Sequence, residues 1–192
     1  MSRRFINAWA GSGVLGDLVS HGIDLARYLV DEITDVVADD ATFITQRPRV
    51  VGAASHFSRS SGGTLGPVEN EDYVGALLRF AGGARGTLQS SRASVGDQCT
   101  YGVEVHGERG RWRGTSGGRA GCGTCLDQDY QNAAYATQFV APGSGDLAHF
   151  QPGSDIVMSY DDLKVIKVQR LITSIASGQP VGATMPRWGV RA

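Results

Sequence analysis

Residues 71–92 read EDYVGALLRFAGGARGTLQSSR, and this stretch decides the fold class. Glu71–Phe80 and Ala84–Arg92 both have the composition of strands, and Ala81-Gly82-Gly83 between them is a tight turn whose glycines permit positive φ. Two strands joined by so short a turn run antiparallel, whereas parallel strands need a long crossover. The stretch therefore predicts a β-hairpin within an antiparallel sheet.

The rest of the chain supplies helices at both ends of a run of strands. Apolar residues at three- and four-residue spacing predict helices over 16–30 and 161–177, and Gly178 with Pro180 ends the second. Strand patterns cover 34–46 and 101–106, the latter as a further antiparallel neighbour of the hairpin. Residues 109–124 have neither period, and 126–157 read as loop. The sequence predicts a single α+β domain over 1–192, an open, mainly antiparallel sheet with helices on one face.

Composition excludes several classes of protein. The 192 residues are 41% hydrophobic, which is enough for a core, and their net charge of −1 gives no basic patch for nucleic acid. No apolar run approaches the roughly 20 residues of a membrane span. Three cysteines, an odd number, argue against a disulfide framework. A cytoplasmic protein is expected.

Gly11–Gly16 matches the dinucleotide-binding pattern G-x-G-x-x-G, and a predicted helix follows it. The residues before it are too few and too polar to form the buried parallel strand that this fingerprint requires. Asp17 would also place a carboxylate where the pyrophosphate should lie. A degenerate Rossmann domain is therefore kept only as a weak alternative.

The same helix carries Asp17, His21 and Asp24 on one face, at offsets of four and three. A carboxylate four residues from an imidazole can fix its tautomer and raise its basicity, as general-base catalysis requires. The simpler interpretation is a solvated helix face with a local ion pair. A metal site would need a third ligand that the sequence does not identify.

Several segments resemble the C-terminal domain of the Gfo/Idh/MocA oxidoreductases, the glucose–fructose oxidoreductase and inositol dehydrogenase family, whose fold is that of the dihydrodipicolinate reductase C-terminal domain. GSGVLGDLVSHGIDLARYL is similar to the family's glycine-rich turn and D-x-x-x-H helix. The likeness continues through 68–96, 101–110 and SYDDLKVIKVQRLITSIASGQPVGAT at 159–184. The resemblance implies an oxidoreductase that transfers hydride between a sugar or polyol hydroxyl and NAD or NADP, with no metal.

The resemblance also implies roles for particular residues. His21 would exchange the proton of the substrate hydroxyl, and Asp17 would orient His21 or bind a neighbouring hydroxyl. Asp24 on the same helix, Arg92 at the end of the hairpin and Tyr160 at the start of the last helix would line the substrate pocket. The cofactor would lie mainly on an N-terminal Rossmann domain, and the sheet face would form homo-oligomers.

The sequence departs from the family in ways that predict an incomplete enzyme. No Rossmann unit precedes Gly11, and the family's Glu-Lys-Pro segment is absent. Residues 111–124 and 185–192 are atypical, and we expect them to be out of frame or disordered. A gene fragment, inactive alone, is therefore expected, and the alternative is a non-catalytic dimerisation or binding module derived from the domain.

Two further signals favour ordinary structural roles. Cys122-Gly-Thr-Cys125 is a C-x-x-C pattern without the context of a redox or zinc site. The acidic cluster Glu69–Asp72 is most simply an exposed strand start, although Glu69 or Asn70 near a polyol pocket stays open.

Overall fold

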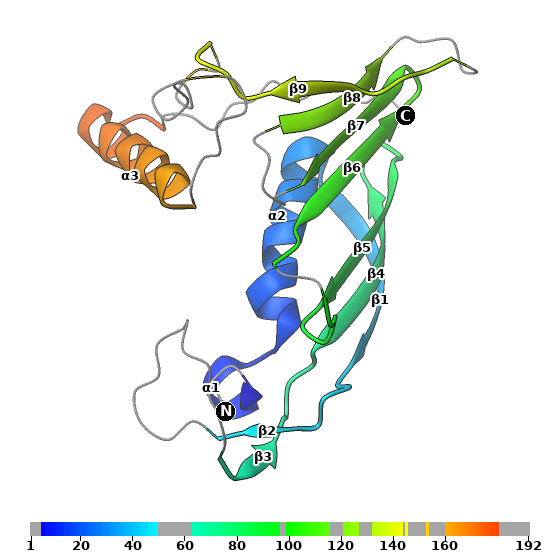
Figure 1. The fold of residues 1–192 in the computed structure, drawn as a ribbon, viewed down its shortest axis with the longest axis vertical. Helices are drawn as coiled ribbons and strands as arrows, with labels where there is room; N and C mark the ends of the chain where they lie inside the picture. Colours follow the sequence, from blue (N-terminus) through cyan, green and yellow to red (C-terminus); the bar gives the residue numbers. More distant parts are fainter. Residues whose placement is uncertain are drawn as a thin grey trace. The chain divides into compact units, whose positions relative to one another are not determined.

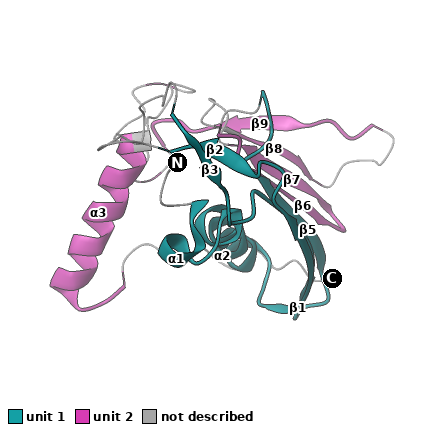
Figure 2. Cartoon of the chain, turned by 90° about the horizontal axis from the view of Figure 1, so that it is seen from below, with its two compact units in different colours: residues 1–96 teal, residues 97–192 magenta. Residues whose placement is uncertain are grey.

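The computed structural model describes residues 5–49, 63–96, 99–115, 121–126, 132–143, 145, 153 and 160–180 (Figure 1). The chain divides into two compact units, residues 1–96 and 97–192, where the sequence predicts a single domain (Figure 2). The predicted α+β class with antiparallel strands is confirmed. The predicted tail 185–192 lies outside the described residues.

The first unit has a three-stranded antiparallel sheet in the order β1-β4-β5 and a separate two-stranded ribbon, β2-β3. Its helices all precede the strands. The elements are α1 (Asn7–Ala10), the π-helical turn η2 (Leu15–Val19), α2 (Ser20–Leu29), β1 (Ile33–Ala41), β2 (Gln46–Pro48), β3 (Leu65–Pro67), β4 (Tyr73–Phe80) and β5 (Arg85–Ser91).

The predicted hairpin is present as β4 and β5. Leu77 pairs with Thr87 and Arg79 with Arg85, and Gly83 in the turn adopts a φ of 92°. Glycine is needed there because side chains strongly disfavour this region of backbone space. The strand predicted from residue 34 is confirmed as β1. It pairs with the edge of β4 opposite to β5.

The helices cover one face of this sheet (Figure 1). The buried core consists of Val14, Val19 and Val74, with Ile23 and Leu88 packed against it. Of the apolar stripe predicted for the helix, Leu15 and Leu18 are exposed instead. The reason is the π-helical turn, whose i→i+5 hydrogen bonding brings Val14 and Val19 to the same face.

In the second unit, the described residues form a four-stranded antiparallel sheet in chain order and one helix. The strand predicted at 101–106 is present, but its partner among the described residues is β7 rather than a strand of the hairpin. Within the stretch that has no period, residues 110–115 and 121–124 are strand. The pattern gave no sign of β7 because Trp112 is its single large apolar residue, which leaves no alternation to detect. The elements are β6 (Gly102–Gly107), β7 (Gly110–Thr115), β8 (Gly121–Leu126), β9 (Ala136–Phe139) and α3 (Tyr160–Ser177).

Helix α3 confirms the predicted second helix, and Gly178 follows it with a φ of 64°. The apolar spacing of this helix predicts a buried stripe. Among the described residues of the stripe, however, only Ile166 is buried. The other members are more than half exposed: Leu163, Leu171, Ile172 and Ile175.

None of the helices within the described ranges is long and apolar enough to cross a membrane.

The second unit carries an exposed ion pair between Glu104 of β6 and Arg111 of β7. The hydrogen bond from Arg111 lowers the pKa of Glu104, and His106 lowers it further. A lowered pKa makes the pair stabilising above the ordinary carboxyl pKa, and this contribution disappears as the pH falls through the lowered value. We expect Arg111→Gln to return the pKa of Glu104 toward its ordinary value, as measured by NMR titration of the carboxyl resonance. An unchanged titration would contradict the pairing.

Candidate functional site

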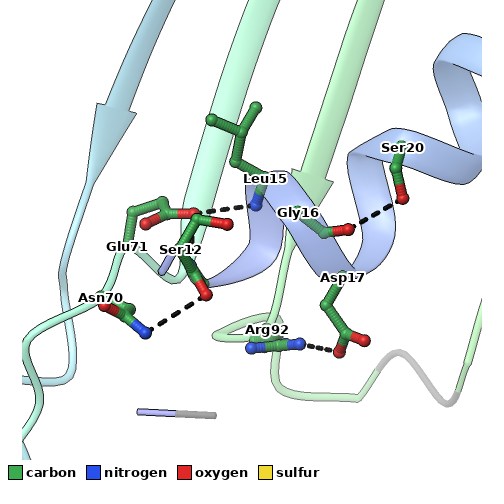
Figure 3. A network of polar contacts seen from close by, with 9 residues as sticks. Ser12, Leu15, Gly16, Asp17, Ser20, Asn70, Glu71 and Arg92 are labelled. Carbon is green, nitrogen blue, oxygen red and sulfur yellow. Dashed lines mark hydrogen bonds and ion pairs between the residues drawn. The ribbon is translucent and has the colours of Figure 1, made fainter. Parts of the chain in front are cut away.

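The glycine-rich turn at the start of the helix is closed by a side chain from the sheet. The Glu71 carboxylate accepts a hydrogen bond from the backbone N–H of Gly13, at 2.7 Å. It accepts another from the backbone N–H of Leu15, at 2.9 Å (Figure 3). A side chain at residue 13 would meet the backbone oxygen of Glu71 at 2.0 Å, so only glycine fits. A pyrophosphate at a helix N-terminus would need these same amide groups. Glu71 already engages them.

This arrangement corrects the interpretation of residues 69–72 as an exposed strand start. Asp72 is only 1% exposed, and its carboxylate accepts hydrogen bonds from the backbone amides of Phe43 and Ile44 at 2.8 Å. Asn70 is also buried, and its amide donates to the backbone oxygen of Ser12 (Figure 3). These partners are 28 to 58 residues away in the sequence, so no local pattern indicates them.

We expect Glu71→Ala to destabilise the first unit by about 2 kcal/mol, because two helix-terminal amides lose their charged acceptor. Urea unfolding of the chain measures the change. Glu69→Ala is the matched control, because Glu69 accepts from one exposed amide, that of Asn7, and its loss should cost less than half as much. Equal losses in the two variants would contradict a special role for Glu71.

Asp17 and Arg92 come together although 75 residues separate them. The Arg92 guanidinium donates to the Asp17 carboxylate (Figure 3), and their side chains are only 14% and 35% exposed. Arg92 directly follows β5, and its backbone N–H donates to the backbone oxygen of Asp72 at 2.7 Å. The ion pair thus ties the first helical turn to the end of the hairpin.

A second arginine lies against the same aromatic ring as Arg92, that of Phe5. The guanidinium carbon of Arg47 is 4.7 Å from the centre of the Phe5 ring, and that of Arg92 is 6.0 Å from it. Buried donors of both arginines, Nε and Nη2 of Arg47 and Nη1 of Arg92, have no hydrogen-bond partner among the described residues. Sequence reasoning missed Arg47, since a lone arginine in a short ribbon strand gives no signal.

His21 and Asp24 lie on α2, and both are exposed. His21 is one helical turn beyond Asp17, so the two side chains are neighbours on the helix surface. Asp24 is three residues further on. An imidazole in this position can be reached by a small molecule and can exchange a proton with it. The helix thus presents an accessible imidazole, and Arg92 from the end of β5 pairs with Asp17 on the preceding turn.

The remaining candidate residues belong to the second unit. Tyr160 begins α3 in the second unit, and its side chain lies outside what the structure describes. Cys122 and Cys125 are free thiols three residues apart on β8, a spacing that points side chains to opposite faces of a strand. Among the described residues, no group of three or more His, Cys, Asp or Glu could hold a metal ion.

Comparisons with known proteins agree with this architecture. The GFO/IDH/MocA C-terminal domain matches residues 1–113. Levoglucosan dehydrogenase of Pseudarthrobacter phenanthrenivorans is 32% identical over 184 residues, which cover 94% of this chain and 47% of that protein. Myo-inositol 2-dehydrogenase of Thermotoga maritima is 28% identical over 104 residues, 52% of this chain and 25% of that protein. The chain thus spans about half or less of these relatives.

Solved structures give the same result. Levoglucosan dehydrogenase in complex with NADH and L-sorbose superposes with a TM-score of 0.82 at 30% identity, over 96% of this chain and 46% of that one. An oxidoreductase domain protein from Kribbella flavida superposes with a TM-score of 0.81 at 26% identity, over 95% of this chain and 48% of that one. With the match over 1–113, these similarities show that the chain belongs to the GFO/IDH/MocA oxidoreductase family and carries its C-terminal domain.

Proposed function

We propose that this chain is the substrate-binding half of an NAD(P)-dependent oxidoreductase that transfers hydride between a sugar or polyol hydroxyl and nicotinamide. One observation carries the proposal. An exposed histidine lies one helical turn from Asp17, which is itself paired with Arg92, in a chain whose similarities are with dehydrogenases. A general base beside a fixed carboxylate is the arrangement that alcohol oxidation needs.

The proposed chemistry at this site is a proton transfer. During oxidation, His21 accepts the proton of the substrate hydroxyl as the carbon that bears it loses a hydride, and in reduction it returns the proton. Bound NAD or NADP supplies the hydride acceptor. Asp17 orients His21 or accepts a hydrogen bond from a neighbouring hydroxyl. Positioned proton transfer of this kind contributes roughly 10²–10⁴ in rate.

The proposed substrates are sugars and cyclic polyols. The relatives are named for levoglucosan and myo-inositol, and one of the solved structures holds L-sorbose. Adjacent ring hydroxyls need several donors and acceptors at once. We propose that Asp24 accepts a hydrogen bond from one hydroxyl and that Arg92 donates to another substrate oxygen. A substrate contact from Tyr160 stays a prediction from the sequence.

The proposed cofactor site is outside these 192 residues. The G-x-G-x-x-G turn does not fit a pyrophosphate, because Glu71 already engages its amides. Calorimetric titration of the chain with NADH and NADPH tests this directly. We expect no binding, and no turnover of any sugar by the chain alone. Micromolar binding of either dinucleotide would contradict the proposal.

A second candidate function, assembly, is favoured by one surface. Val37 of β1 and Leu77 of β4 are register partners and are 71% and 61% exposed. Exposed apolar patches on a sheet are typical of interfaces. We propose that this face forms a homo-oligomer. Light scattering after size exclusion should show a dimer or larger, and Leu77→Lys should dissociate it. A monomeric parent chain would exclude the assembly function.

A further inference from the structure

We infer that Arg92 is a positioning residue, which holds the Asp17 carboxylate and so sets the charge beside His21. This inference rests on the proposed function, because it assigns Arg92 a task in addition to substrate contact. The inference is based on a series of contacts that leads from the buried edge of the sheet to the helix.

In the first of these contacts, the backbone of Arg92 is held in place by Asp72. The buried Asp72 holds the amides of Phe43 and Ile44, and its own backbone oxygen accepts the N–H of Arg92. The guanidinium is only 14% exposed and lies against the Phe5 ring. The backbone of Arg92 is hydrogen-bonded and its planar guanidinium lies against an aromatic ring. Such a side chain loses little further conformational freedom when it binds a carboxylate. Arg92 is thus preorganised for its partner.

The second link is the turn that carries Asp17. Its backbone N–H donates to the oxygen of Gly13, the glycine that Glu71 fastens to the sheet. Asp17 is therefore fixed from its main chain as well as from its carboxylate. The contrast is the Arg79–Asp35 pair on β4 and β1, whose 3.8 Å contact joins two side chains that are more than half exposed. Solvent and salt screen that pair far more than the pair of Arg92 and Asp17.

The third link is electrostatic. Among the described residues, the charged groups on the turn and the elements next to it include the Glu71 carboxylate, Asp24 on α2, Arg47 beside the Phe5 ring, and the pair of Arg92 with Asp17. While Arg92 opposes Asp17, the negative charge next to His21 is largely balanced. Without Arg92, the charge of the Asp17 carboxylate is no longer balanced, and it favours the protonated form of the neighbouring imidazole. A protonated imidazole cannot accept a proton from a hydroxyl, so Arg92 keeps His21 available as a base.

The test is an NMR titration of the His21 imidazole in the full 192-residue chain and its variants. We expect Arg92→Gln to move the titration midpoint upward by roughly 0.5 to 1 pH unit, and Arg92→Lys to move it less. In the Asp17→Asn background, Arg92→Gln should move it far less, because the arginine acts through Asp17. If Arg92→Gln does not fold, Arg92→Lys is compared in the same two backgrounds.

The control and the contrary results are equally specific. Arg79→Gln removes an arginine from an exposed pair and should leave the His21 titration unchanged. Equal shifts from Arg92→Gln with and without Asp17 would mean that the arginine charge acts on His21 directly, and would overturn the inference. The absence of any shift would overturn it as well. The readout needs neither sugar nor cofactor, so failure of the proposed function would leave this result standing.

Discussion

Asp72→Ala is expected to destabilise the first unit by about 3 kcal/mol or more. The Asp72 carboxylate is almost fully buried and accepts two backbone N–H groups, those of Phe43 and Ile44. Hydrogen bonds to a charged acceptor contribute about 1.5–3 kcal/mol each, and deleting the acceptor leaves both amides unpaired. Urea unfolding, followed by the amide resonances of β1 and β4, measures the loss.

Two variants delimit this expectation. Asp72→Asn keeps one oxygen but turns an NH₂ group toward the second amide, so an intermediate loss is expected. Asp35→Ala removes an exposed carboxylate from β1 and should change stability by less than about 0.5 kcal/mol. A loss for Asp72→Ala no larger than for Asp35→Ala would show that the buried carboxylate does not hold the two segments together.

The second large effect is on catalysis. With this chain joined to the cofactor-binding domain of a family member, His21→Ala is expected to lower kcat by roughly 10²–10⁴, because the proton of the substrate hydroxyl loses its acceptor. The loss should be smaller at high pH, where hydroxide and buffer bases can take the proton.

His106→Ala is the matched control for this experiment. His106 is also an exposed histidine, but it lies on β6 in the second unit. Its removal should leave kcat within about twofold of the parent. If both histidine variants retained full activity, His21 would have no catalytic role.

The sequence predicts the regular elements of this protein well, because their signals are local. The hairpin is defined by a glycine turn between two strands, and the helices by the spacing of their apolar residues. The strands β7, β8 and β9 could not be predicted, since β7 is glycine and arginine around one tryptophan. Pairing with a neighbouring strand, β7 with β6, β8 with β7 and β9 with β8, makes them strands where no local pattern predicts it.

The candidate site is predictable only in part, for a similar reason. Asp17 and His21 share a helix, so spacing alone places them together. The contacts that organise them cross the chain, from Glu71 to the glycine turn and from Arg92 to Asp17. The π-helical turn is also invisible in an apolar pattern, and it moves Leu15 and Leu18 to the surface.

The most direct test of the central claim is an NMR titration of the chain with a sugar or cyclic polyol, observed at the histidine side chains. If the helix face of Asp17 and His21 is the substrate surface, the imidazole resonances of His21 shift with saturable, millimolar affinity. Those of His106 should stay unchanged, and Asp17→Asn should weaken the response. Saturable binding that leaves His21 unaffected, or no binding of any sugar or polyol, would contradict the claim.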